Sequence, residues 1–114
     1  MKNSGSRKIS ERYVSALFDI SLANGVLVPV EKDLAALADL IKENADFSAF
    51  LYNPLLSSEA KNIIAANLMQ KIGTHQLTAQ FIALLARNKR LDLLPEIIKI
   101  FLERAATERG EMAA

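Results

Sequence analysis

The sequence predicts an all-α fold, a compact bundle of about six short helices. Hydrophobic residues make up 51% of the 114 residues but aromatic residues only 6%, so the apolar mass is chiefly Ala, Leu and Ile. Ala and Leu are strong helix formers. No strand-like alternation and no hairpin signal appears. Five breaks with turn or cap chemistry divide the chain into helix-length segments: Asn24-Gly25, around Asp46, Asn53-Pro54, Gly73-Thr74 and Asn88-Lys89.

The first helix is expected to begin near Ser10, as its N-cap, and to end at Gly25, which can adopt the left-handed conformation that closes a helix. The second is expected from about Pro29, whose fixed φ suits a first helical turn. Its apolar residues recur at helical spacing and are Val30, Leu34, Leu37, Ala38, Ile41 and Ala45.

A short third helix is predicted over residues 47–53, capped by Asp46. The proline that follows ends it, because the residue before a proline is pushed out of the helical region. Ser57 or Ser58 is expected to cap the fourth helix, which Gly73 closes. The apolar residues of that helix are Ile63, Ile64, Leu68 and Ile72.

The fifth helix is predicted from a Thr74 cap to about Asn88, and the sixth over residues 91–109. Pro95 falls in the first turn of the sixth helix, where a missing amide costs little. Gly110 is expected to end it. The main apolar stripe of this helix is Leu94, Ile98, Phe101 and Ala105.

The length suits one domain, which we place at residues 10–110. Residues 1–9 are polar, lack the apolar core of a secretory signal, and are expected to form a disordered tail. Residues 111–114 are expected to be a second tail. The longest uncharged stretch, residues 72–86, is too short and too polar for a membrane span.

The sequence offers little for catalysis, metal binding or a cofactor. It contains no cysteine and one histidine, so a disulfide framework or a transition-metal site lacks ligands. His75 lies in a polar stretch and is interpreted as a solvated histidine. Asp19 falls on the polar side of its helix and is interpreted as a surface charge. No carboxylate pair and no glycine-rich phosphate loop is present, so we expect no enzyme activity and no cofactor.

Two small basic clusters lie near the start of the first helix and the end of the fifth, and they could meet in space. They are Arg7, Lys8 and Arg12, and Arg87, Lys89 and Arg90. A net charge of +1 and the absence of interleaved aromatic residues weaken a nucleic-acid interpretation.

Two helices carry more apolar surface than one core face requires. In the first helix one stripe is Val14, Leu17 and Phe18, and an adjoining stripe is Tyr13, Ala16 and Ile20. In the fifth, one side is Ile82, Leu85 and Ala86, and another is Leu77, Phe81, Leu84 and Asn88. If adjacent, these helices would form a groove for an amphipathic partner helix. The alternative is that a small bundle buries its central helices on all sides.

Three segments resemble the ATP synthase delta subunit family, called the oligomycin sensitivity-conferring protein in mitochondria. Residues 12–19 read RYVSALFD, similar to the family's opening R-Y-A-x-A-L-F-x motif. Asn53-Pro54 followed by residues 57–61 resembles the family's break before its fourth helix. Residues 84–95 read LLARNKRLDLLP, similar to its L-x-x-N-G-R-L-x-x-L-P junction, with Lys89 where the family usually has glycine.

The resemblance implies a six-helix N-terminal domain that grips the N-terminal helix of an alpha subunit, and so links the catalytic head to the peripheral stalk. Carried over by motif, the gripping surface comprises Tyr13, Ala16, Leu17, Ile20, Phe81, Leu84 and Asn88. It also implies a stator component without catalysis, whose contact with the peripheral stalk b subunit is mainly through a C-terminal domain absent after Gly110. The location implied is the cytoplasmic face of a bacterial inner membrane, peripheral, with the membrane reached only through the complex.

Two other interpretations remain open at this point. Antitermination proteins resembling the bacterial N-utilisation factor share the helical topology and carry arginines before the first helix, which suggests RNA binding. The same groove could also mediate self-association.

Overall fold

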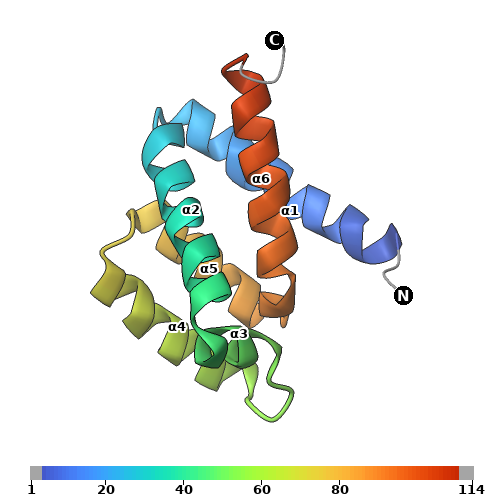
Figure 1. Cartoon of the computed structure of the whole chain (residues 1–114), viewed down its shortest axis with the longest axis vertical. Coiled ribbons are helices and arrows are strands. Elements are labelled where there is room, and N and C mark those ends of the chain that lie inside the picture. The colour runs from blue at the N-terminus through green and yellow to red at the C-terminus, as the bar shows by residue number, and fades with distance from the viewer. Residues whose placement is uncertain (1–3, 111–114) are drawn as a thin grey trace.

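The computed structural model describes residues 4–110 as a bundle of six α-helices and one 3₁₀ turn, with no strand among these residues (Figure 1). The elements are α1 (Ser4–Ala23), α2 (Leu27–Glu43), α3 (Ala45–Tyr52), α4 (Ser58–Ile72), α5 (Gln76–Arg87), η1 (Leu91–Leu93) and α6 (Leu94–Glu108). The predicted all-α fold class is confirmed. None of the described helices is long and apolar enough to cross a membrane.

α1 begins earlier than the sequence indicated, and its first turns extend past α6 (Figure 1). The prediction of a disordered tail over residues 1–9 is therefore wrong for residues 4–9; residues 1–3 and the predicted tail at 111–114 lie outside the described residues. Ser10 is a fully buried residue within α1 and not its N-cap. Glu96 of α6 explains this, because its Oε1 accepts hydrogen bonds from Ser10 Oγ at 2.8 Å and from Ser6 Oγ at 3.2 Å.

The N-termini of α3 and α4 are capped by hydrogen bonds to side chains that are close in the sequence. Asn44 caps α3, because its Oδ1 accepts from the backbone N–H of Phe47 at 3.0 Å, so the predicted Asp46 cap is wrong. Ser57 caps α4 and Gly73 closes it with a φ of +80°, as predicted. Asn and Ser are preferred N-cap residues, and Gly is preferred where a helix ends in the left-handed conformation.

α5 is attached to α2 at its N-terminus. His75, and not Thr74, caps α5, since its Nδ1 accepts from the backbone N–H of Leu77 at 3.0 Å. The histidine therefore has a structural role in place of the solvated position we expected. Asp33 of α2 accepts from the backbone N–H of His75 at 2.8 Å and from the hydroxyl of buried Thr78 at 2.7 Å. These bonds set the position of one wall of the groove described below.

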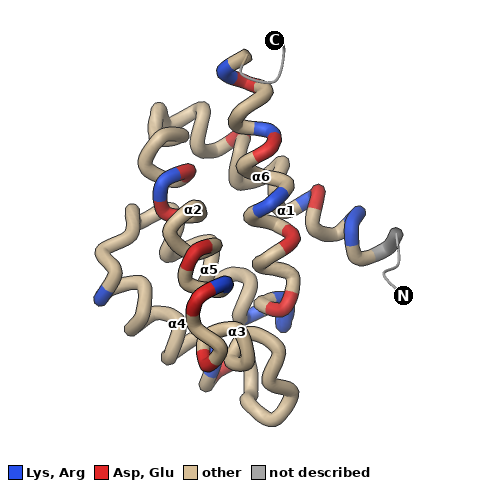
Figure 2. Tube along the Cα trace, viewed as in Figure 1, with Lys and Arg blue, Asp and Glu red and all other residues tan. Residues whose placement is uncertain are grey.

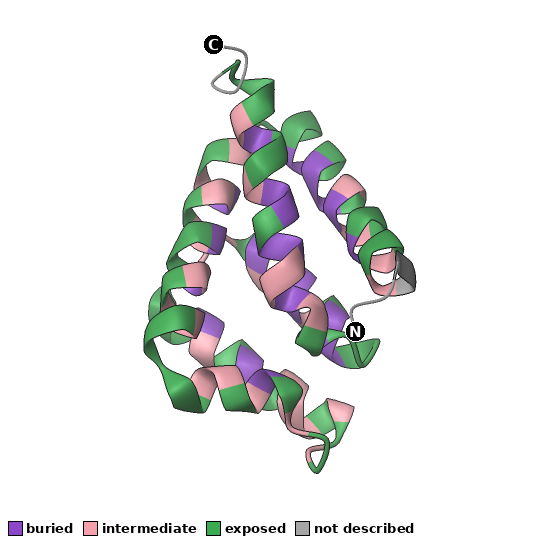
Figure 3. Cartoon of the chain, turned by 45° about the vertical axis from the view of Figure 1, so that its right-hand side comes forward, coloured by how far each residue is buried: buried purple, intermediate pink, exposed green. Residues whose placement is uncertain are grey.

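α6 is the central helix, packed against α1 on one side and α2 on the other, while α4 packs chiefly against α5. Buried residues of these helices face the inside of the bundle (Figure 3). The stripe predicted for the sixth helix is buried, and Pro95 lies in its first turn, although residues 91–93 form a 3₁₀ turn before it. α6 contributes Leu94, Ile97, Ile98, Ile100, Phe101 and Ala105 to the core.

Arg104 of α6 attaches the outer side of α1. Its guanidinium lies over the buried ring of Phe18, 4.4 Å from the centroid. It also donates to Ser15 Oγ at 3.1 Å and lies 3.6 Å from the carboxylate of Asp19. Asp19 is exposed, as predicted. α1 is thus held against α6 on this side, which leaves its opposite side to face α5.

The turn after α5 takes the left-handed conformation at Lys89, with a φ of +60°. This confirms that Asn88 or Lys89 has to adopt the geometry that glycine accepts without strain. We expect Lys89→Gly to raise the free energy of unfolding by about 0.5–1 kcal/mol, the relief of the Cβ clash less the greater freedom of glycine in the unfolded chain. Urea unfolding measures the difference.

Lys71→Gly is the matched control, because Lys71 is an exposed lysine inside the last turn of α4. A glycine there should lower the free energy of unfolding by about 0.8–1 kcal/mol. Equal destabilisation by both substitutions would contradict the assignment of strain to Lys89.

Candidate binding groove

Six of the seven residues predicted to bind a partner line one hollow between α1 and α5. The hollow has a volume of about 220 Å³. Its lining comprises Tyr13, Ala16, Leu17, Ile20, Leu77, Gln80, Phe81 and Leu84. Asn88, the seventh predicted residue, does not line it. The structure therefore brings the two adjoining apolar stripes together across a concave surface.

The lining residues differ in depth. Leu17 and Phe81 are 2% and 6% exposed, so they form the floor and belong to the core. Ile20 and Leu84 are 45% and 36% exposed and form the walls. Partly exposed apolar side chains gathered on both sides of a concave apolar strip are typical of an interaction surface. The alternative of two helices buried on all sides does not describe these residues.

Tyr13 connects the two walls. Its ring meets Phe81 edge to face, with centroids 6.1 Å apart and an interplanar angle of 76°. Its hydroxyl oxygen accepts a hydrogen bond from Asn88 Nδ2 at 2.8 Å. Asn88 therefore contributes to the groove by positioning Tyr13. The edge-to-face ring pair, together with the hydrogen bond from the Asn88 side chain, holds α1 at a set distance from α5.

The hollow continues in both directions along the two helices. Toward the start of α1, a volume of about 470 Å³ shares Tyr13, Ala16 and Leu84 and adds Ile9, Arg12 and Arg90. Toward its end, a volume of about 400 Å³ shares Ile20, Leu77 and Gln80 and adds Asn24, Val26, His75 and Gln76. We call the three together the α1/α5 groove.

The length of the α1/α5 groove suits a short helix. From Arg12 to Asn24 the rise along α1 is about 18 Å, a little over three helical turns. A partner helix of similar length, with apolar residues every three or four positions, would place one of them against the floor in each turn. The groove therefore has the shape and the apolar floor that helix recognition requires.

The gripping surface carried over by motif lacks two residues of the central hollow, Leu77 and Gln80. Helical periodicity had already placed Leu77 in the same stripe as Phe81 and Leu84, at i, i+4, i+7 spacing. Gln80 could not be identified from apolar periodicity, because a single polar residue on a helix does not indicate which surface it borders. Of the two basic clusters, Arg12 and Arg90 do meet at one hollow, as we considered possible.

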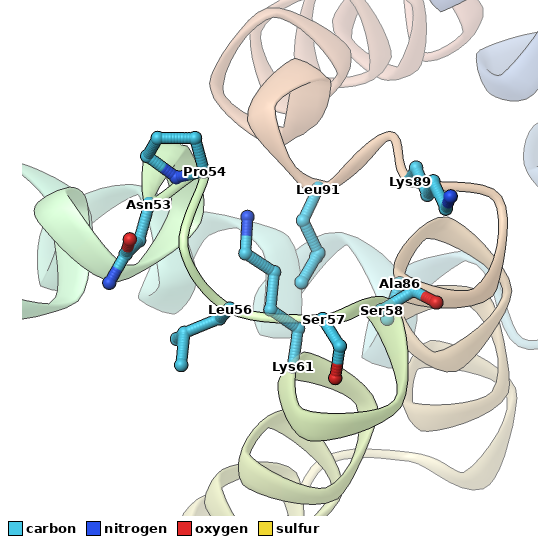
Figure 4. Close-up of a pocket in the computed structure, with 9 residues that line it drawn as sticks. All are labelled: Asn53, Pro54, Leu56, Ser57, Ser58, Lys61, Ala86, Lys89 and Leu91. Atoms are coloured by element: carbon cyan, nitrogen blue, oxygen red, sulfur yellow. The ribbon is translucent and has the colours of Figure 1, made fainter.

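A separate hollow of about 420 Å³ lies between the α3–α4 connection and the turn after α5 (Figure 4). Its lining contains Lys61 and Lys89 but no carboxylate or imidazole, so it offers no acid–base pair. The Lys61 side chain rises between Pro54 and Leu91 in Figure 4, and its amine donates to the carbonyl of Leu51 at 3.1 Å. Among the described residues no group of His, Cys, Asp or Glu could hold a metal ion.

Comparison with known proteins agrees with the motifs. A family model described as ATP synthase delta (OSCP) subunit matches residues 9–114. A protein from Rhizobium leguminosarum bv. trifolii named ATP synthase subunit delta is 37% identical over 106 residues, which cover 93% of this chain and 56% of that protein. One of the same name from Sinorhizobium medicae is 35% identical with the same coverage.

A chloroplast protein of the same family provides a similar match. The protein from Chlamydomonas reinhardtii named ATP synthase delta chain, chloroplastic, is 37% identical over 94 residues, which cover 82% of this chain and 43% of that protein. The chain thus spans about half the length of the curated relatives it matches.

Proposed function

Because the chain belongs to the ATP synthase delta (OSCP) subunit family, we propose that it is a non-catalytic stator component of rotary ATP synthase. In this proposal the α1/α5 groove binds the N-terminal helix of an alpha subunit and so links the catalytic head to the peripheral stalk. The observation that carries the proposal is the exposure of Ile20 and Leu84 above the buried floor made by Leu17 and Phe81.

The energetics favour a helix with an apolar face. Fully burying a large apolar side chain is worth about 1.5–3 kcal/mol. Because Ile20 and Leu84 are only 45% and 36% exposed, covering each would contribute roughly 0.5–1.5 kcal/mol before the costs of association. Those residues are already held by α1 and α5, and Tyr13 is oriented by Phe81 and Asn88. Little ordering of the groove is needed, which favours a specific complex.

A stator acts through binding, since it has to hold the catalytic head still against the torque of the rotor. The proposed location is peripheral, on the cytoplasmic face of a bacterial inner membrane, with the membrane reached only through the complex. Contact with the peripheral stalk b subunit is assigned mainly to the part of the relatives' length that this chain does not cover. We propose no cofactor and no nucleic-acid partner.

The test is a calorimetric titration of this chain with a synthetic peptide of the alpha subunit N-terminal segment. We expect a one-to-one complex, accompanied by a gain in peptide helicity in the far-ultraviolet circular dichroism spectrum. A peptide of the same composition in scrambled order, which has no continuous apolar face, is the control. Equal binding of both peptides, or binding of neither, would contradict the proposal.

The two other interpretations predict different results. An RNA-binding bundle would bind a short single-stranded RNA with an affinity that falls steeply with salt. However, both acidic and basic residues occur along each of α1, α2 and α6, and most of α4 is uncharged (Figure 2). Self-association through the groove would give a mass that rises with concentration in sedimentation, and added alpha peptide would reverse it.

A further inference from the structure

Two arginines at one end of the α1/α5 groove have no acidic partner. Arg12 of α1 and Arg90, which precedes η1, are both exposed and both line the hollow of about 470 Å³. Within residues 4–110 the ion pairs are Arg7 with Glu11, Arg104 with Asp19 and Arg109 with Glu31. The lining of this hollow contains no aspartate or glutamate. It is therefore a positively charged pocket contiguous with an apolar groove.

The lining at the opposite end of the groove contains no lysine, arginine, aspartate or glutamate. Beyond Ile20 and Leu77, its lining adds Asn24, His75 and Gln76, and the imidazole Nδ1 of His75 is occupied as a hydrogen-bond acceptor. The centre is apolar apart from Gln80. The groove is consequently asymmetric in charge along its length, which its apolar floor alone would not indicate.

We propose that the helix bound in the α1/α5 groove carries a carboxylate at the end that lies against Arg12 and Arg90, and that this contact sets the direction and register of the helix. The inference rests on the proposed function and deepens it. An apolar stripe repeats each turn, so a helix can slide by one turn, about 5.4 Å, or reverse, while it still buries apolar residues. A charge pair at one end distinguishes these arrangements.

Arginine suits this role. Its planar guanidinium can bind a carboxylate through two parallel hydrogen bonds, which constrains orientation as well as distance. Two arginines on different elements can contact one carboxylate from both walls. Because both side chains are exposed, the gain in affinity is modest and depends on salt. The main consequence is therefore selection of one binding arrangement.

The test compares two peptides and three forms of the chain. The peptides are the alpha N-terminal segment and a version in which each Asp and Glu is replaced by Asn or Gln. The chains are the wild type, the double variant Arg12→Gln/Arg90→Gln and the control Arg87→Gln, an exposed arginine in the last turn of α5 outside the groove lining. At low salt we expect the double variant to bind the acidic peptide about fivefold more weakly, as two exposed ion pairs would give.

Four further results are expected. The amide peptide should bind the wild type and the double variant with equal affinity, and Arg87→Gln should change neither affinity more than about twofold. In 1 M salt the difference should disappear, since the Debye length falls to about 3 Å. A spin label at the acidic end of the peptide should broaden backbone NMR signals near Arg12 and Arg90 in the wild type, and signals at both ends of the groove in the double variant.

The outcomes separate the inference from the proposed function. Equal affinities for all chains, with binding still lost in Leu84→Asp, would overturn the role of the arginines and leave the groove as the binding site. An alpha segment with no carboxylate on its groove-facing end would do the same. Failure of the wild type to bind either peptide would overturn both proposals. Tight binding of oligouridylate that the double variant loses would assign the arginines to RNA and overturn the inference.

Discussion

Replacing Leu84 by aspartate is expected to weaken binding of the alpha N-terminal peptide by at least about 2 kcal/mol, roughly 30-fold. The side chain is a wall of the α1/α5 groove, and a carboxylate there would have to lose its water against the apolar face of the bound helix. The cost to folding should stay near 1 kcal/mol, from lower helix propensity and a negative charge near the C-terminal end of α5. Calorimetric titration and thermal unfolding measure the two effects.

The control for Leu84→Asp is Leu55→Asp, since Leu55 lies in the connection between α3 and α4 and is 91% exposed. It should leave peptide binding unchanged. Tyr13→Asp should also weaken binding by at least about 2 kcal/mol. It should lower stability as well, because Tyr13 packs against Phe81 and accepts a hydrogen bond from Asn88. A collapse of the midpoint in Leu84→Asp would place Leu84 in the core and contradict the groove.

Phe101→Ala should cost about 3–5 kcal/mol of unfolding free energy, the range for truncating a large buried aromatic side chain. Phe101 is fully enclosed in α6, the central helix, and its ring lies 5.5 Å from that of Phe18 in α1. Its removal would leave a cavity where the two helices meet. For a domain of this size the midpoint should fall by more than about 12 °C. Urea and thermal unfolding provide the measurement.

Leu55→Ala is the control for Phe101→Ala, because it truncates an apolar side chain that is already in water; its effect should stay within about 0.5 kcal/mol. Peptide binding to folded Phe101→Ala, measured well below its midpoint, should remain detectable, since Phe101 does not line the groove. A loss of less than 1 kcal/mol in Phe101→Ala would contradict the central position of α6.

Periodicity alone was enough to separate the two faces of α1. Val14, Leu17 and Phe18 recur on one face and are buried, whereas Ile20 falls on the adjoining face and is exposed. The prediction succeeded because burial in a helix follows angular position, and angular position follows directly from residue number. Leu17 borders both faces, which explains why it is at once a core residue and part of the groove floor.

Long-range contacts explain what the sequence could not predict. Residue type and neighbours predict that Ser10 is an N-cap. In the structure its hydroxyl donates to Glu96, which is 86 residues away in the sequence, and Ser10 lies inside α1. The cap of α5 is similar, because Asp33 from α2 binds the backbone of His75 and places the imidazole where it can accept from Leu77. Local helix propensity does not depend on hydrogen-bond partners that are distant in the sequence. The starts of the helices are therefore predicted less well than their buried faces.

The attachment of α1 to α6 at separate points along its length has a mechanical consequence. Glu96 holds α1 near its start through Ser6 and Ser10, and Arg104 holds it further along through Ser15 and Asp19. A force applied along a helix bound beside α1 would load both groups of contacts at the same time, in shear, and would not break them one after another. Linkages that share a load in parallel endure larger forces than the same linkages broken in succession.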